Sequence, residues 1–233
     1  MRCLLHAVLL AGLLSTAAPA AEMAVDLELV FAVDASGSVD DGEFVLQLQG
    51  IAAALGDEAV LRAIAAGPQK RIAVNLLVWA EPQVPKDQSG WMVIASRREA
   101  IEAAAVIAGF ARRQSGGTGI GDGIAHALRS FAENGIAAPR RVVDVSGDGT
   151  ETTPRDYVVT ISQARAMAAA LGATINGLAI ENEVPGLAQW YRDHVQIGAD
   201  SFVMAAADYA DFARAMRQKL LREIMPQARV SRR

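Results

Sequence analysis

Short runs of consecutive apolar residues recur along the chain, separated by longer stretches in which apolar residues have helical spacing. The apolar runs cover residues 27–33, 71–80, 141–145, 173–180 and 201–205. Runs of this length with few polar positions are typical of strands buried on both faces of a parallel sheet. A further run at residues 91–95 follows a loop containing Pro and Gly, which favours an edge hairpin. The pattern predicts a mostly parallel sheet with one antiparallel edge strand.

The stretches between these runs predict helices. Their ranges are residues 42–66, 97–112, 119–134, 157–171, 187–195 and 209–224. Gly172 follows the fourth of these stretches, and glycine is favoured just after the end of a helix. Because strands and helices alternate, we expect helices on both faces of the sheet. The predicted fold class is a doubly wound α/β domain of three layers, Rossmann-like in architecture, over residues 22–225, with a tail at residues 226–233.

The first 21 residues have a different pattern, which is typical of an export signal. Arg2 precedes an apolar run at residues 4–14, and small residues follow, with Ala18 and Ala20 in an A-x-A arrangement. This order predicts a signal peptide at residues 1–21, cleaved near Ala20 or Ala21. The run is shorter than the roughly 20 residues of a transmembrane helix. We therefore expect an exported protein, periplasmic or secreted, with no transmembrane segment after signal removal.

Composition and charge exclude several classes of function. The 233 residues are 52% apolar and carry a formal net charge of -4, with a pI near 5.4. An acidic chain lacks the basic excess that neutralises phosphates, so nucleic acid is not an expected partner. The chain has one cysteine, within the predicted signal, which excludes an internal disulfide and a cysteine-based zinc site.

The candidate chemistry lies directly after predicted strands, where ligands bind in doubly wound sheets. Asp34, Ser36 and Ser38 follow the first strand at alternate positions, so their side chains can face one point if the segment is extended. Asp148 follows the 141–145 strand, and Thr118 lies in a glycine-rich segment between two helices. These side chains offer only carboxylate and hydroxyl oxygens. Hard oxygen donors suit Mg²⁺, with Mn²⁺ or Ca²⁺ as alternatives, better than zinc or copper.

These segments resemble the metal-ion-dependent adhesion site of von Willebrand factor type A domains. Asp34-Ala-Ser36-Gly-Ser38 looks like the D-x-S-x-S motif of that family, Thr118 like its separate threonine and Asp148 like its later aspartate. The similarity extends over most of the chain after the signal, and is closest to an exported bacterial subgroup of these domains that has no established function. It implies that the three hydroxyls bind a divalent metal and that the two aspartates bind it directly or through water. It also implies a protein partner that presents an acidic residue to an open coordination position, and no enzymatic activity.

Three further acids could form a rim around such a site. Glu81 follows the 71–80 run, Asp122 comes shortly after Thr118, and Glu151 follows Asp148. They could select a partner or add to the metal shell, but for Glu81 and Glu151 the favoured interpretation is solvated loop acids, and for Asp122 it is a solvated position in the first turn of a helix. The pairs Arg97-Arg98 and Arg112-Arg113 are interpreted as the polar ends of one helix.

Other functions remain open from the residues alone. Asp34 and the serines could form an ordinary helix cap, and the glycines after Gly117 superficially suggest a dinucleotide loop, although no strand precedes them. Ser146 lacks the elbow motif of serine hydrolases, and neither His126 nor His194 has an evident catalytic partner. The alternatives are a magnesium-dependent hydrolase using Asp34 and Asp148, and a metal-free structural domain of an envelope assembly.

Overall fold

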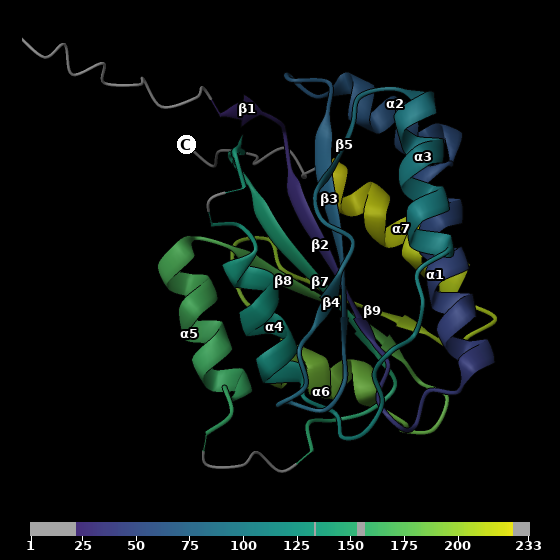
Figure 1. The fold of residues 1–233 in the computed structure, drawn as a ribbon, viewed down its shortest axis with the longest axis vertical. Coiled ribbons are helices and arrows are strands. Elements are labelled where there is room, and N and C mark those ends of the chain that lie inside the picture. The colour runs from purple at the N-terminus through teal and green to yellow at the C-terminus, as the bar shows by residue number, and fades with distance from the viewer. Residues whose placement is uncertain (1–21, 133, 153–156, 226–233) are drawn as a thin grey trace, which may run out of the picture.

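A β-sheet of mostly parallel strands forms the middle layer of the protein (Figure 1). The computed structural model describes residues 22–132, 134–152 and 157–225, so the predicted signal peptide and tail lie outside the described residues. Within that part of the chain the strand order is β4-β3-β2-β7-β8-β9, and β5 also pairs with β3. The strands are β2 (Glu28–Asp34), β3 (Ile72–Trp79), β4 (Asp87–Gln88), β5 (Met92–Ile94), β7 (Arg141–Gly147), β8 (Thr174–Ile180) and β9 (Val203–Ala206).

The five longer strands are parallel, and the two short strands β4 and β5 are both antiparallel to β3. The expected doubly wound α/β class is therefore confirmed, with two short antiparallel edge strands where one was predicted. A separate parallel pair joins β1 (Met23–Ala24) to β6 (Ile136–Ala137). The sequence pattern did not predict this pair, because two-residue strands are too short to show a period.

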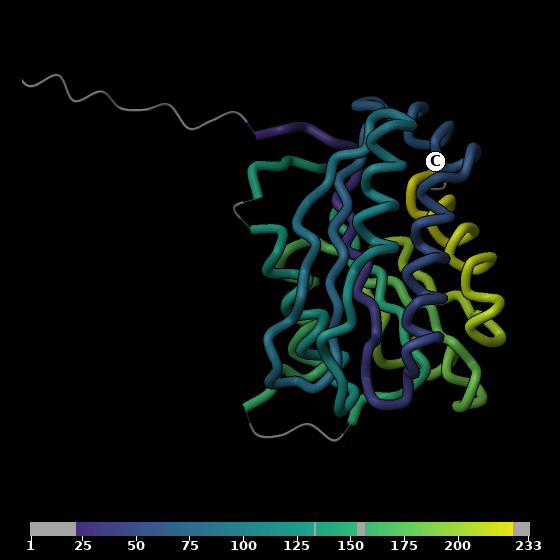
Figure 2. Tube along the Cα trace, turned by 45° about the vertical axis from the view of Figure 1, so that its right-hand side comes forward, coloured from purple at the N-terminus to yellow at the C-terminus, as the bar shows by residue number. Residues whose placement is uncertain are grey.

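Helices cover both faces of the sheet. The described helices are α1 (Asp41–Leu55), α2 (Glu58–Ala66), α3 (Arg97–Ala108), α4 (Ile120–Arg129), α5 (Ile161–Leu171), α6 (Leu187–His194) and α7 (Phe212–Ile224). Alternate residues of β2 enter different cores: Phe31 packs with residues of α1, α3 and α7, whereas Val30 packs with residues of α4, α5 and α6. Figure 2 shows the yellow α7 beside the dark blue α1, so the two ends of the domain share one layer.

Helix boundaries differ from the predicted ranges where capping residues intervene. The predicted 42–66 helix is two helices, because Gly56 ends α1 and the Asp57 side chain caps α2 by accepting from the N–H groups of Ala59 and Val60. The predicted 157–171 helix begins only at Ile161, since Thr160 forms a capping box with Gln163. Gly172 has a left-handed φ of 64°, as its position after a helix predicts.

Two other predicted helices are shorter at their C-terminal ends. The predicted 97–112 helix ends at Ala108, and Gly109 follows it as the cap. The predicted 119–134 helix ends at Arg129, and the residues that follow turn toward β6. As a consequence Arg112 lies in an irregular segment and not at a helix end. In the described part of the chain no single helix is long and apolar enough to cross a membrane, although α1 and α2, bent by 55°, pass that length and composition test together.

The sheet brings the ends of three strands together. Asp34 at the end of β2 pairs with Trp79 at the end of β3, and Val33 pairs with Ser146 of β7. The chain leaves β2 toward β3 on one side and returns to β7 on the other, so the strand order reverses at β2. Ligands bind at such switch points in doubly wound sheets, and the predicted site residues lie here.

Candidate metal centre

Asp34 is the buried centre of the site. It ends β2 with no exposed surface, and its Oδ1 atom accepts a hydrogen bond from the Ser36 N–H at 2.7 Å. The other carboxylate oxygen, Oδ2, is also buried and has no hydrogen-bond partner among the described residues. A buried carboxylate with an unpartnered oxygen is unfavourable unless a cation or a proton neutralises it.

The serine hydroxyls and Asp148 lie beside this carboxylate. Ser36 Oγ is 3.3 Å from Ser38 Oγ, and Ser38 Oγ donates to Asp148 Oδ1 at 2.7 Å. Asp148, which follows β7, is only 2% exposed. The alternate spacing of the first motif therefore places both serines toward one point, and a residue 110 positions away completes the group.

Burial dominates the electrostatics of Asp34. Loss of hydration raises the pKa of Asp34 to about 7; hydrogen bonds from Ser36 lower this pKa, and the nearby Asp148 charge raises it. Gly147 lies against the same carboxylate, because a Cβ at this position would be 2.8 Å from Asp34 Oδ2. The site thus concentrates negative charge in a place from which water is largely excluded.

Thr118 lies in a neighbouring loop that backbone hydrogen bonds join to the first motif. The Gly37 N–H donates to the Gly116 carbonyl at 2.8 Å, which holds the loop of residues 115–119 against residues 35–38. Thr118 exchanges hydrogen bonds with Thr152, donating its N–H to Thr152 Oγ1 at 2.9 Å. A Cβ on Gly149 would be 4.0 Å from Thr118 Oγ1, so this hydroxyl faces the segment after Asp148.

Two of the predicted rim acids accept hydrogen bonds from backbone N–H groups close to Thr118 in the sequence. Glu81 Oε2 accepts from the Gly117 N–H at 2.8 Å, and Glu151 Oε2 accepts from the Gly121 N–H at 3.0 Å. Glu151 is half-buried, and burial raises its pKa to about 7. The interpretation of these two residues as solvated loop acids is therefore wrong, because Glu81 helps to shape the loop that carries Thr118 and Glu151 binds the first turn of α4, which follows that loop.

Asp122 has a different environment from the predicted one. It is 7% exposed, and its Oδ2 atom is 3.0 Å from Lys86 Nζ, whose side chain is fully buried. Lys86 also donates to the carbonyl oxygens of Glu81 and Val84, each at 2.8 Å. The expectation that Asp122 is solvated is wrong, because the loop of residues 81–86 lies over the start of α4 and buries this ion pair.

Arg112 contributes to the site in a way that the sequence pattern did not indicate. Its Nη2 group donates to the carbonyl oxygens of Ala35, Ser36 and Val39, at 3.1, 3.0 and 2.6 Å. Its Nη1 group donates to Asp41 Oδ1 at 2.7 Å. One guanidinium therefore holds the whole loop between β2 and α1. The interpretation of Arg112 as the end of a helix is wrong, because α3 ends at Ala108. Gly109, which caps α3, is the sequence signal that could have placed Arg112 beyond the helix.

Tyrosines also reach the aspartates. Tyr209, which precedes α7, donates its hydroxyl to Asp148 Oδ2 at 2.9 Å. The Tyr191 hydroxyl of α6 is buried without a hydrogen-bond partner among the described residues, 2.8 Å from where a Gly147 Cβ would lie. No sequence signal pointed to either residue, since 61 positions separate Tyr209 from Asp148.

The residues considered for hydrolytic chemistry have structural partners. Ser146 Oγ donates to Gln47 Oε1 at 3.2 Å, and Gln47 Nε2 donates to the Asp34 carbonyl at 3.0 Å. The Nδ1 atoms of His126 and His194 are 2.9 Å from the carbonyl oxygens four residues earlier in their own helices. The Gln47 contacts order the core behind Asp34, and neither histidine pairs with Ser146.

The donor set fits a hard divalent cation. The described residues include no group of three or more His, Cys, Asp or Glu side chains suited to a metal ion. The site offers instead two carboxylates and nearby hydroxyls, with the buried Asp34 Oδ2 still without a partner. Mg²⁺ binds few carboxylates and retains waters, so a site of this composition suits it.

Solved structures share this fold. The pilus adhesin SpaC from Lactobacillus rhamnosus GG is 12% identical, with a TM-score of 0.60, over 86% of this chain and 30% of that one. The mussel byssus protein PTMP1, with a zinc-occupied MIDAS motif, is 16% identical, with a TM-score of 0.60, over 86% and 48%. The minor pilin PilB from Streptococcus sanguinis is 13% identical, with a TM-score of 0.57, over 90% and 64%. The chain thus spans about a third to two thirds of these proteins.

These neighbours confirm the resemblance to von Willebrand factor type A domains at the level of the fold. A search among curated protein sequences finds no match. A family model matches residues 24–228, which is nearly all of the chain beyond the predicted signal. The chain therefore belongs to the family described as protein of unknown function DUF1194, and its domain has a von Willebrand factor type A-like fold.

Proposed function

We propose that this protein is a metal-dependent protein-binding module, with Mg²⁺ as the cation and Asp34, Ser36, Ser38, Thr118 and Asp148 as its ligands. The observation that carries the proposal is the buried Asp34 carboxylate, whose Oδ2 atom has no hydrogen bond in the described structure. Asp148 and two serine hydroxyls lie next to it. The zinc-occupied MIDAS motif of the structural neighbour PTMP1 adds support from the fold.

In this proposal each side chain has a separate task. Asp34 and Asp148 supply the negative charge, directly or through water, and the hydroxyl groups supply neutral oxygen donors. A serine hydroxyl can donate its hydrogen to a carboxylate and still offer lone pairs to a cation, so the Ser38 to Asp148 hydrogen bond is compatible with metal binding. Arg112 and Glu81 hold the two ligand-bearing loops in place.

The partner is proposed to be a protein that presents an aspartate or glutamate side chain to the metal. Two carboxylates balance the charge of a bound Mg²⁺ but do not fill its coordination shell, so Mg²⁺ keeps exchangeable waters. A carboxylate from a partner would replace one such water. Glu81 and Glu151 stay candidates for the rim that selects this partner, whereas Asp122 is engaged with Lys86. We also propose export through the segment of residues 1–21, and no enzymatic activity.

Metal binding is tested by calorimetric titration and thermal unfolding with Mg²⁺, Mn²⁺ and Ca²⁺. A ligand that binds only the folded state, present at 100 times its Kd, stabilises that state by about 2.7 kcal/mol. Asp34→Ala should abolish the Mg²⁺-induced shift in unfolding temperature. Asp193→Ala on the exposed surface of α6 is the matched control and should keep the shift. Equal stabilisation of wild type and Asp34→Ala would contradict the proposed ligand set.

Partner binding is tested separately by affinity capture from an envelope extract, once with Mg²⁺ and once with chelator. A specific partner should be retained with Mg²⁺, and lost with chelator and with Asp34→Ala. Substituting each surface carboxylate of that partner in turn should identify one that abolishes capture. A partner that binds equally well with chelator would contradict the bridging role of the metal while leaving metal binding itself intact.

A further inference from the structure

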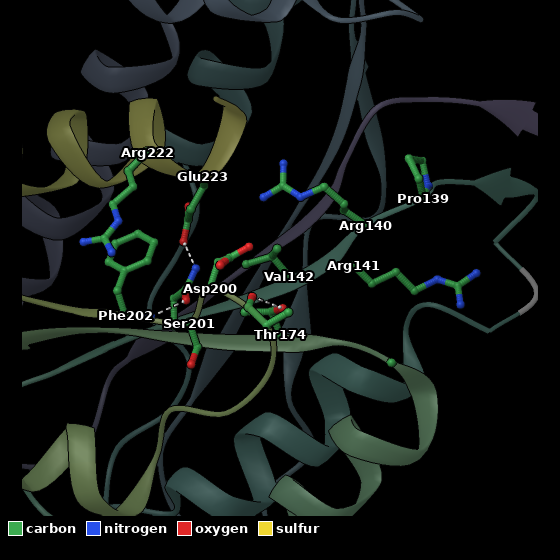
Figure 3. Close-up of a pocket in the computed structure, with 13 residues that line it drawn as sticks. Pro139, Arg140, Arg141, Val142, Thr174, Asp200, Ser201, Phe202, Arg222 and Glu223 are labelled. Carbon is green, nitrogen blue, oxygen red and sulfur yellow. Dashed lines mark hydrogen bonds between the residues drawn. The ribbon is translucent and has the colours of Figure 1, made fainter. Parts of the chain in front are cut away.

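A cavity of about 510 Å³ (Figure 3) is lined by residues where β7 and β8 begin, which is the end of the sheet opposite to the candidate metal centre. It is lined by residues at the beginnings of β7 and β8, by the segment that precedes β9 and by the last turn of α7. The metal centre, in contrast, lies beyond the ends of β2 and β7. The cavity is thus a separate feature of the molecule, and no sequence motif points to it.

Glu223 supplies an unpartnered acceptor in this cavity. Its side chain is 1% exposed, and its Oε1 atom accepts from Asn176 Nδ2 at 2.8 Å and from Lys219 Nζ at 2.6 Å. Its Oε2 atom is buried and has no hydrogen-bond partner among the described residues. A buried acceptor without a partner costs folding free energy, which a donor on a bound ligand would recover.

Arg140 supplies the complementary donors. Its side chain is half-buried, and within the described ranges it makes no hydrogen bond or ion pair. Burial lowers the pKa of Arg140, while the nearby charges of Glu223 and Asp200 raise it. Figure 3 shows the Arg140 side chain on the side of the cavity that faces Glu223 and Asp200.

The other two arginines of the lining have partners elsewhere. Arg141 Nε is 3.0 Å from Glu28 Oε2, and the Arg222 guanidinium stacks 3.8 Å from the centre of the Phe202 ring. Figure 3 shows them directed to opposite sides of the cavity. Of the three guanidinium groups, only that of Arg140 has neither a hydrogen-bonded acceptor nor a stacked ring among the described residues, and a simple anion beside it would also meet the negative charges of Asp200 and Glu223.

We propose that this cavity binds a small zwitterion of the amino acid class, with its carboxylate on Arg140 and its ammonium group on Glu223 Oε2 and Asp200. Both signs of charge are present within one cavity, which favours a ligand with both signs over a pure anion or cation. The side chains of Val142 and Phe202 line the same cavity and offer apolar contact to the carbon skeleton. The proposal does not depend on the metal centre.

The test compares three probes that share a four-carbon chain: γ-aminobutyrate, butyrate and butylamine. Binding is measured by calorimetry, and by the chemical shifts of backbone amides in isotope-labelled protein. We expect γ-aminobutyrate to bind with the highest affinity and to shift the amides of residues 199–202 and 222–223. Butyrate binding as strongly as γ-aminobutyrate would overturn the proposal in favour of an anion site. Shifts absent from these residues with all three probes would overturn it entirely.

Two variants test which side chain binds each charged group of the ligand. Arg140→Gln should weaken γ-aminobutyrate binding about tenfold, since a charge-assisted pair is lost. Arg98→Gln is the matched control, because Arg98 is exposed on α3 and bonded only to Glu102 there, and it should bind like wild type. Asp200→Asn should weaken γ-aminobutyrate and strengthen butyrate; Asn tolerates the positive φ of 58° at this position. Unchanged affinity in both Arg140→Gln and Asp200→Asn would overturn the proposal.

Discussion

At the scale of single residues, the candidate site depends on a carboxylate that the fold buries. Asp34 loses its hydration at the end of β2, and only one of its two oxygens receives a hydrogen bond among the described residues. The pKa of Asp34 rises to about 7 for this reason. Without a cation, the folded state therefore holds a proton on this group at pH values where the unfolded chain does not.

The pH dependence of stability follows from this shift. The folded-state pKa of Asp34 is raised, so the folded state binds more protons between its ordinary pKa of 3.8 and about 7, and stability falls as pH rises through that window. The full difference is up to about 4 kcal/mol. Urea unfolding of metal-free protein at pH 4 to 8 should show this loss in wild type and a smaller loss in Asp34→Asn.

Glu151 and Asp144 also have pKa values raised to about 7 by burial, so they contribute in the same direction in both proteins. The difference between wild type and Asp34→Asn isolates the contribution of Asp34. Parallel stability curves would show that this carboxylate is not buried as described. Added Mg²⁺ should stabilise wild type more at pH 8 than at pH 5, because the proton and the metal compete for one carboxylate.

At the scale of elements, the site is a set of loops held at fixed positions by side chains from other segments. The loop between β2 and α1 carries Ser36 and Ser38, and Arg112 donates to three of its carbonyl oxygens. The loop that carries Thr118 is held by Glu81 and by the Gly37 to Gly116 hydrogen bond. The geometry of the proposed ligands therefore depends on residues that would not touch a metal.

Arg112→Gln should loosen the loop between β2 and α1. Hydrogen bonds from a charged donor contribute about 1.5–3 kcal/mol each, and water replaces part of this, so we expect a loss of about 2–3 kcal/mol in unfolding free energy. Mg²⁺ affinity should also fall, because Ser36 and Ser38 lose their fixed positions. Arg113→Gln is the adjacent control, since the Arg113 side chain is 72% exposed and its ion-pair distance is 4.0 Å. Similar results for both variants would contradict the role of Arg112 in holding this loop.

At the scale of the whole molecule, a buried polar network ties α7 to the sheet. Lys219 is fully buried, with its Nζ atom 2.6 Å from both Asp144 of β7 and Glu223 of α7. Asn176 of β8 joins the network through Glu223 and accepts from the Phe202 N–H at 3.0 Å. The same network forms one wall of the cavity that we propose as a zwitterion site.

Lys219→Met should destabilise the whole domain, because it leaves Asp144 and Glu223 as buried carboxylates without their cation. Removal of one partner from a buried ion pair costs about 3–5 kcal/mol. Chemical denaturation should report this loss, whereas Lys70→Met at an exposed position should change stability little. A variant as stable as wild type would mean that the network has no net stabilising effect.

The pattern of apolar and polar residues along the sequence determined most of the strands and helices of this protein. The continuous apolar runs predicted the buried parallel strands, because a strand covered on both faces has few polar positions. The helical stretches predicted the two outer layers, with boundaries corrected where Gly56, Asp57 and Thr160 cap helices. The spacing of Asp34, Ser36 and Ser38 predicted one face of the site, since side chains of an extended segment alternate.

Only the tertiary structure decided which distant groups meet. Arg112 binds the loop between β2 and α1, Tyr209 binds Asp148, and Lys86 binds Asp122. Each of these contacts joins segments that no local periodicity connects. The burial of Lys219 and the cavity beside it depend on where α7 lies over the sheet. These features follow from the path of the chain in space, which sets hydration and charge pairing independently of separation along the sequence.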